Sequence, residues 1–135
     1  MLNWDEKYSL GIDVIDGQHK QLIAIGNELY TLLSERAGED IFDDMVEIID
    51  KLKDYTVYHF EFEEDLFEKF GYADSAAHIA EHNKFVNTLE NTDLHAVDSD
   101  QAAHGMKILK FVIDWIYKHI SGTDTKYAST LKGKI

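Results

Sequence analysis

Residues 45–70 read MVEIIDKLKDYTVYHFEFEEDLFEKF, and one stripe of side chains in this stretch repeats with the period of a helix. Steps of four and three residues alternate along the stripe, which places its members on a single helix face. The stripe consists of Met45, Ile49, Leu52, Thr56, His59, Glu63, Leu66 and Phe70. The pattern predicts a long helix from about residue 40 to residue 70, with a histidine and a glutamate on its inward face.

Three further segments, at about residues 13–35, 75–90 and 100–120, show the same alternation, and Ser75 suits the N-cap of the second of them. Their stripes are Ile15, His19, Leu22, Gly26, Leu29 and Leu33; His78, His82, Phe85 and Leu89; and Leu109, Val112, Ile116 and His119. Four such stripes joined by short connections predict an all-α protein, an antiparallel up-down four-helix bundle.

The first dozen residues, which include Trp4 and Tyr8, are expected to form an N-terminal arm over the bundle rather than a fifth helix. No strand pattern of useful length, internal repeat or linker interrupts the chain. A length of 135 residues suits one hydrophobic core, so residues 1–135 are expected to form a single domain.

The composition excludes several kinds of site and partner. Since the chain has no cysteine, any metal must be held by nitrogen and oxygen ligands. A formal net charge of -13 makes nucleic acids and anionic membrane surfaces poor partners. No apolar run approaches the roughly 18 residues of a transmembrane helix, and the N-terminus lacks the features of a signal peptide. A cytoplasmic location is therefore expected.

Polar groups interrupt all four apolar stripes at about the same level of the predicted bundle. Burying each without a partner costs about 1–3 kcal/mol, and far more for an isolated charge. A shared metal centre would satisfy them together. The interrupting residues are His19, His59, Glu63, His78, His82 and His119.

Taken singly, several of these residues also have an ordinary interpretation. His59 and Glu63, with acidic residues beside them, suit a solvated acidic helix face. His19 alone suits a hydrogen-bonded core residue, and His119 suits a helix C-terminus when protonated. His78 and His82 are four residues apart, so both can bind one metal ion from the same helix face. Asp124 lies five residues after His119, about 140° around a regular helix, so it reaches the centre only if the helix breaks, and Gly122 could break it.

The chain resembles the hemerythrin family, and bacterial single-domain hemerythrins (bacteriohemerythrins) in particular. The resemblance rests on the segments 15–20 (IDGQHK), 59–64 (HFEFEE), 78–82 and 115–120 (WIYKHI), together with Asp124. It implies a non-haem di-iron centre with an oxo or hydroxo bridge. One iron would take His78, His82 and His119, the other would take His19 and His59, and Glu63 and Asp124 would bridge them.

The resemblance also implies reversible binding of molecular oxygen, for carriage, storage or delivery, rather than an enzyme activity. The partner would be molecular oxygen itself, bound at the iron with fewer ligands. Residues next to the ligands could line an oxygen pocket or be plain core: Leu22, Ile23, Phe60 and Ile116. Alternatives on the same bundle are a di-iron oxidase or peroxidase, or a module that senses oxygen or iron. His95 and His104 are expected to be structural or surface residues, and the mildly basic tail from residue 126 onward gives no functional signal.

Overall fold

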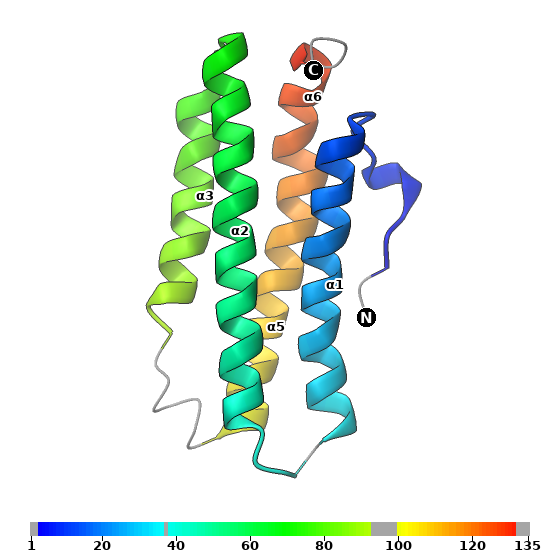
Figure 1. Cartoon of the computed structure of the whole chain (residues 1–135), viewed down its shortest axis with the longest axis vertical. Coiled ribbons are helices and arrows are strands. Elements are labelled where there is room, and N and C mark those ends of the chain that lie inside the picture. The colour runs from blue at the N-terminus through cyan, green and yellow to red at the C-terminus, as the bar shows by residue number, and fades with distance from the viewer. Residues whose placement is uncertain (1–2, 37, 93–99, 132–135) are drawn as a thin grey trace.

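The computed structural model describes residues 3–36, 38–92 and 100–131. Four long helices run side by side along the longest axis of the molecule (Figure 1). They are α1 (Asp13–Glu35), α2 (Phe42–Phe70), α3 (Ser75–Glu90) and α5 (Gln101–Lys118). Successive helices run in opposite directions, so the predicted antiparallel four-helix bundle is confirmed, and the described residues form no strand.

The helix boundaries follow from local signals in the sequence. Helix α2 ends at Gly71, whose positive φ of 68° is readily adopted by glycine. Helix α5 begins after Asp100, whose side chain accepts a hydrogen bond from the backbone N–H of Ala103. The prediction that Ser75 caps α3 is wrong by one residue, because Asp74 is the N-cap and Ser75 is the first helical residue.

The prediction that the last helix ends near residue 120 is also wrong. After α5 the chain continues as a π-helical segment, η2 (His119–Asp124), and then as α6 (Thr125–Leu131). Gly122 therefore does not break the helix. Tyr127 and Leu131 of α6 are completely buried, so the tail contributes to the core.

The N-terminal arm lies beside α1, as expected (Figure 1), and contains the short 3-10 helix η1 (Glu6–Tyr8). Trp4 and Tyr8 pack against the central core, where the Tyr8 and Tyr117 rings are 5.2 Å apart. Asp16 holds the arm to the start of α1, because its carboxylate accepts hydrogen bonds from the Ser9 hydroxyl and the Leu10 backbone N–H.

Three apolar clusters fill the bundle along its length. A central cluster includes Phe60, Phe85 and Ile116. One end of the bundle is filled by a cluster around Phe67 and Tyr127, and the other end by one around Leu29 and Met45. These three clusters form the apolar interior of the bundle.

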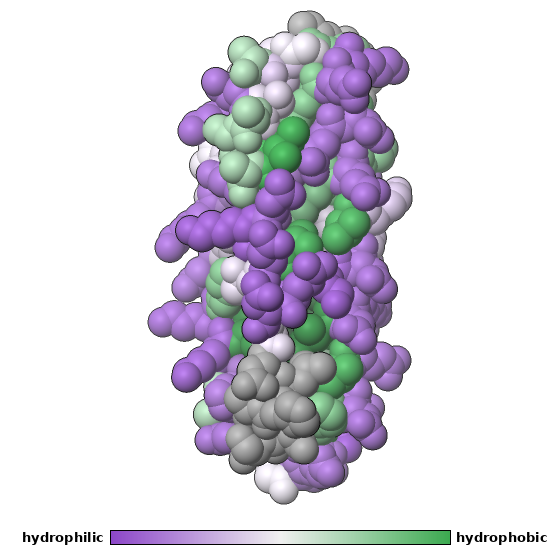
Figure 2. Space-filling view, turned by 90° about the vertical axis from the view of Figure 1, so that its left-hand side faces the viewer, coloured by the Kyte–Doolittle hydropathy of each residue, from purple (hydrophilic) through white to green (hydrophobic). Residues whose placement is uncertain are grey.

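Hydrophilic side chains cover most of the face that carries α3, and hydrophobic surface shows only in narrow strips between them (Figure 2). No helix within the described ranges is both long enough and apolar enough to cross a membrane.

Candidate metal centre

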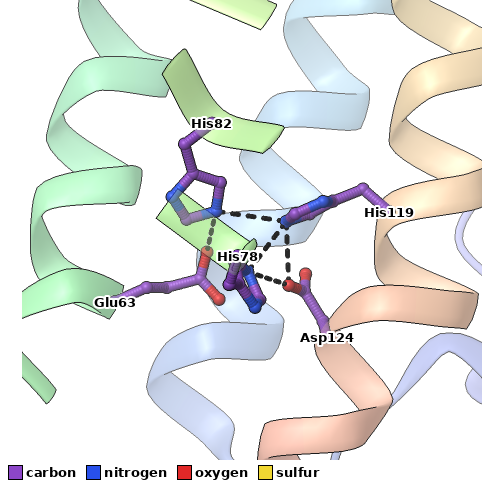
Figure 3. Close-up of side chains that lie close together, drawn as sticks. All are labelled: Glu63, His78, His82, His119 and Asp124. Carbon is purple, nitrogen blue, oxygen red and sulfur yellow. Dashed lines mark hydrogen bonds and ion pairs between the residues drawn. The ribbon is translucent and has the colours of Figure 1, made fainter. Parts of the chain in front are cut away.

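All seven predicted ligand side chains come together in a polar layer inside the bundle. Each of them is at most 4% exposed to solvent. Helix α1 contributes His19, α2 contributes His59 and Glu63, α3 contributes His78 and His82, and η2 contributes His119 and Asp124. Figure 3 shows five of them from three sides of the bundle, with imidazoles and carboxylates pointing toward one another.

The polar layer is enclosed by aromatic rings of the two adjoining apolar clusters. On one side Phe60 stacks on His82 at 3.9 Å, and Trp115 stacks on His119 at 4.2 Å between ring centroids. On the other side Phe67 and Tyr127 lie 4.8 Å and 5.4 Å from the ring of His78. These rings hold the imidazoles in place and keep bulk water away from them.

The ligand atoms fall into two groups that could each hold one metal ion. The larger group contains Glu63, His78, His82, His119 and Asp124, and the smaller contains His19, His59, Glu63 and Asp124. Within each group the atoms lie within 4.8 Å of one another. The two carboxylates belong to both groups, and only a residue between two ions could serve both.

The π-helical segment places Asp124 in the centre. In a π-helix the hydrogen bonds run from residue i to i+5, so side chains five residues apart face the same side. Accordingly, Asp124 Oδ1 lies 2.9 Å from Nε2 of His119 and 2.9 Å from Nε2 of His78. Asp124 Oδ2 lies 3.0 Å from Nε2 of His19. The wider π-helical turn, and not a break in the helix, therefore brings the Asp124 carboxylate to the centre.

Glu63 occupies the corresponding position on the opposite side of the centre. Its Oε1 lies 3.0 Å from Nε2 of His59 and 3.4 Å from Nε2 of His82. Burial and the charge of Asp124 act to raise the pKa of Glu63, but the charge and contacts of His59 and the contact with His82 lower it to about 2. Glu63 is therefore a carboxylate at neutral pH.

The charge balance of the layer favours positive charge at its centre. Burial opposes ionisation of Asp124, but the charge of His119 and the contacts with His119, His19 and His78 hold its pKa well below the usual value. Burial likewise opposes protonation of His119, yet the two buried carboxylates and Glu81 raise its pKa. Buried anions of this kind require protons or a metal cation nearby.

Several polar atoms at the centre form no well-directed hydrogen bond among the described residues, although imidazole and carboxylate groups lie close together there. They are Nε2 of His19, both oxygens of Glu63 and both oxygens of Asp124. Leaving such buried atoms unsatisfied is costly. Imidazole nitrogens and carboxylate oxygens suit iron, so the orphaned atoms and the donor set both fit that metal.

Hydrogen-bond partners at Nδ1, the ring nitrogen that faces away from the centre, fix the orientation of two of the imidazoles. His59 Nδ1 donates to the amide oxygen of Gln18 at 2.6 Å, and His119 Nδ1 donates to Glu81 at 2.9 Å. With the proton on Nδ1, a neutral ring presents the lone pair of Nε2 to the centre. Gln18 and Glu81 were not predicted from the sequence, although both adjoin predicted ligands in the chain.

Tyr127 is another residue near the centre that the sequence analysis missed. It is fully buried, and burial followed by the charges of Glu63 and Asp124 raises the pKa of its hydroxyl group, so the phenol stays neutral. The only signal in the sequence is an aromatic residue three positions after Asp124.

The four residues predicted to line an oxygen pocket are all buried in the central apolar cluster next to the polar layer: Leu22, Ile23, Phe60 and Ile116. Their contact with oxygen stays a prediction. His104 lies in the first turn of α5 and belongs to neither ligand group, and His95 lies outside the described residues.

The family model described as the Hemerythrin HHE cation binding domain matches residues 10–131. A bacteriohemerythrin of Clostridium acetobutylicum is 36% identical over 127 residues, covering 94% of this chain and 98% of that protein. A bacteriohemerythrin of Stenotrophomonas maltophilia is 32% identical and covers 100% of this chain and 84% of that protein. A crystal structure of wild-type hemerythrin superimposes with a TM-score of 0.82 at 31% identity, covering 98% of this chain and 99% of that one.

Proposed function

Because this chain belongs to the hemerythrin family, we propose that it holds two iron ions between its helices and binds molecular oxygen reversibly there. The observation that carries the proposal is the sharing of Glu63 and Asp124 by two groups of ligand atoms. Two shared carboxylates are what a pair of bridged metal ions needs, and a single metal site would not need them.

In this proposal each iron takes its ligands from one of the two groups. His78, His82 and His119 would hold one ion, His19 and His59 would hold the other, and Glu63 and Asp124 would bridge the pair. When bound in the ferrous state, the ions supply the electrons that make oxygen binding possible and that return when oxygen leaves. The position with two histidines has one protein ligand fewer, and oxygen would bind on that side.

The protein contributes a dry and apolar surrounding. Leu22, Ile23, Phe60 and Ile116 are each at most 4% exposed and lie in the cluster that adjoins the polar layer. Excluding water limits proton delivery to bound oxygen, which favours its release unchanged. The buried side chains thereby favour reversible binding over oxygen consumption.

The numbers of imidazole and carboxylate ligands also favour reversible binding of oxygen. Five neutral imidazoles and two carboxylates bring less negative charge to the iron pair than the carboxylate-rich sites of other di-iron bundles. High-valent iron is correspondingly less favoured, as a carrier, store or deliverer of oxygen requires. The proposed role is therefore that of a binding protein and not of an enzyme.

The test is anaerobic reduction of the purified protein followed by addition of oxygen, with visible absorption recorded and iron counted per chain. Two irons and a charge-transfer band that appears with oxygen and fades under vacuum are expected. Rapid bleaching with release of peroxide would replace the proposal with an oxidase or peroxidase. Absence of iron after growth and purification with iron present would contradict the metal centre itself.

A further inference from the structure

The outer ring nitrogens of the histidines face different partners in the two ligand groups. In the larger group, Nδ1 of His119 lies 2.9 Å from a carboxylate oxygen of Glu81. In the smaller group, Nδ1 of His59 lies 2.6 Å from the amide oxygen of Gln18. One position thus has an anionic acceptor behind its imidazole, and the other has a neutral acceptor.

The remaining histidines strengthen this asymmetry. Nδ1 of His82, in the larger group, lies 3.4 Å from a carboxylate oxygen of Glu64. Nδ1 of His78, also in the larger group, and Nδ1 of His19, in the smaller group, have no partner among the described residues. Carboxylates therefore face two of the three imidazoles in the larger group and neither imidazole in the smaller one.

Glu81 is placed to act on His119 without being part of the core. It follows His78 by three residues on α3 and reaches across to His119, while its side chain remains 48% exposed. A half-exposed carboxyl group of this kind is ionised at neutral pH. A half-exposed carboxylate that crosses to another helix is a poor packing residue and a suitable hydrogen-bond acceptor.

An acceptor behind a metal-binding imidazole changes the electron density that the imidazole donates. A carboxylate draws the Nδ1 proton toward itself and makes Nε2 the stronger donor, whereas an amide oxygen does so less. Stronger donation stabilises the more highly charged state of a metal ion. The two positions therefore differ in the oxidation state that they favour.

The geometry points to Glu81 as a positioning residue that makes the three-histidine position the more electron-rich of the two, with Gln18 as its neutral counterpart at the two-histidine position. This inference rests on the proposed function, because it assigns unequal ease of oxidation to the two irons. The iron held by His119 is the easier one to oxidise. The iron held by His59, where oxygen would bind, is the easier one to keep ferrous.

Three variants of the iron-loaded protein test this assignment. Glu81→Gln keeps the size of the side chain and removes its charge, and Gln18→Glu adds a charge behind His59. Glu90→Gln, at the exposed end of the same helix α3, removes one carboxylate far from the histidines and serves as the matched control. The midpoint potential of the centre is measured by reductive titration, and the affinity for Co²⁺ is measured after removal of iron.

We expect the potential to shift upward in Glu81→Gln, downward in Gln18→Glu and not at all in Glu90→Gln. A further variant, Glu81→Ala, removes the acceptor altogether, and its Co²⁺ affinity should fall by about 10- to 100-fold. The affinity of Glu81→Gln, which keeps a hydrogen-bond acceptor, should fall by less. A potential of Glu81→Gln equal to that of Glu90→Gln would overturn the assignment. So would an upward shift in Gln18→Glu.

Failure of the inference is distinguishable from failure of the proposed function. If wild-type protein carries two irons and forms a reversible oxygen adduct while Glu81→Gln leaves its potential unchanged, only the role of Glu81 is wrong. If wild-type protein carries no iron pair, the proposed function fails whatever the variants show. Should Gln18→Glu fail to fold, Glu81→Gln and its control still decide the role of Glu81.

Discussion

Asp124 lies five residues after His119, and the π-helical turn between them brings Oδ1 of Asp124 to within 2.9 Å of Nε2 of His119. On a regular α-helix these side chains would diverge by about 140°. The wider turn thus lets one short segment supply a histidine of the larger ligand group and a carboxylate that belongs to both groups. The geometry of the site depends on this local departure from the regular fold.

Gly122 is not essential to that turn. Its φ is not positive, and a Cβ atom added to it would meet nothing within 4 Å. We therefore expect Gly122→Ala to keep full iron content and to raise the free energy of unfolding by up to about 1 kcal/mol through lower chain entropy. Iron analysis and urea unfolding measure both. A loss of iron would show that the turn needs glycine.

Gly71→Ala is the contrasting change. Gly71 ends α2 with a φ of 68°, a conformation that costs other residues about 1–2 kcal/mol. The free energy of unfolding should fall by that amount, while the iron content stays normal because residue 71 lies outside the centre. Equal stability of the two glycine variants would contradict the difference in backbone conformation.

The sequence alone predicted the bundle and the ligand candidates other than Asp124 because helical periodicity is a local property. His78 and His82 share a face through their spacing of four, whatever the rest of the chain does. Gln18 and Glu81 escaped prediction because each contacts a histidine on another helix, more than 35 residues away in sequence. Such contacts depend on how the helices pack, which periodicity does not specify.

The course of the chain after Lys118 was unpredictable for a different reason. A π-turn has no strong residue signature, and a neighbouring metal site can stabilise it against the regular helix. Tyr127 and Leu131 were missed as core residues because the helix was expected to end near residue 120.

Removing a shared ligand should have a larger effect than removing an unshared one. Glu63 belongs to both groups, so Glu63→Ala should lower iron from two ions per chain toward none. His82 belongs to the larger group only, so His82→Ala should lower iron mainly at that position and retain part of the metal. Iron analysis after identical purification measures the difference.

His104→Ala is the matched control for these ligand variants. His104 also lies on a helix of the bundle but belongs to neither ligand group. Its substitution should leave iron content unchanged. Loss of iron from His104→Ala, or normal iron in Glu63→Ala, would mean that the ligand assignment is wrong.

Removal of iron should destabilise the protein. A ligand that binds only the folded state stabilises it by about 4 kcal/mol at a thousand times its dissociation constant. Without a metal, the buried oxygens of Glu63 and Asp124 have no hydrogen-bond partner among the described residues. Chelation should therefore lower the melting temperature by several degrees, and added ferrous iron should restore it. The melting temperature of Glu63→Ala should respond to neither treatment.

The apolar wall near the two-histidine group should control how long bound oxygen survives. Leu22 follows His19 by three residues on α1 and lies in the central cluster, with 2% of its surface exposed. Leu22→Ala opens space for water beside the polar layer, so the rate of autoxidation should rise at least several-fold while iron content stays the same. Decay of the oxygen-dependent absorption band measures this rate.

Leu29→Ala separates this effect from general loss of stability. Leu29 lies on the same helix and is equally buried, but it belongs to the cluster at the opposite end of the bundle from the C-terminus of α2. Both truncations should lower the free energy of unfolding by about 2–5 kcal/mol, since both remove the same buried atoms. Only Leu22→Ala should hasten autoxidation. Equal rates in the two variants would mean that loosening of the whole bundle, and not water entering beside His19, limits the lifetime of bound oxygen.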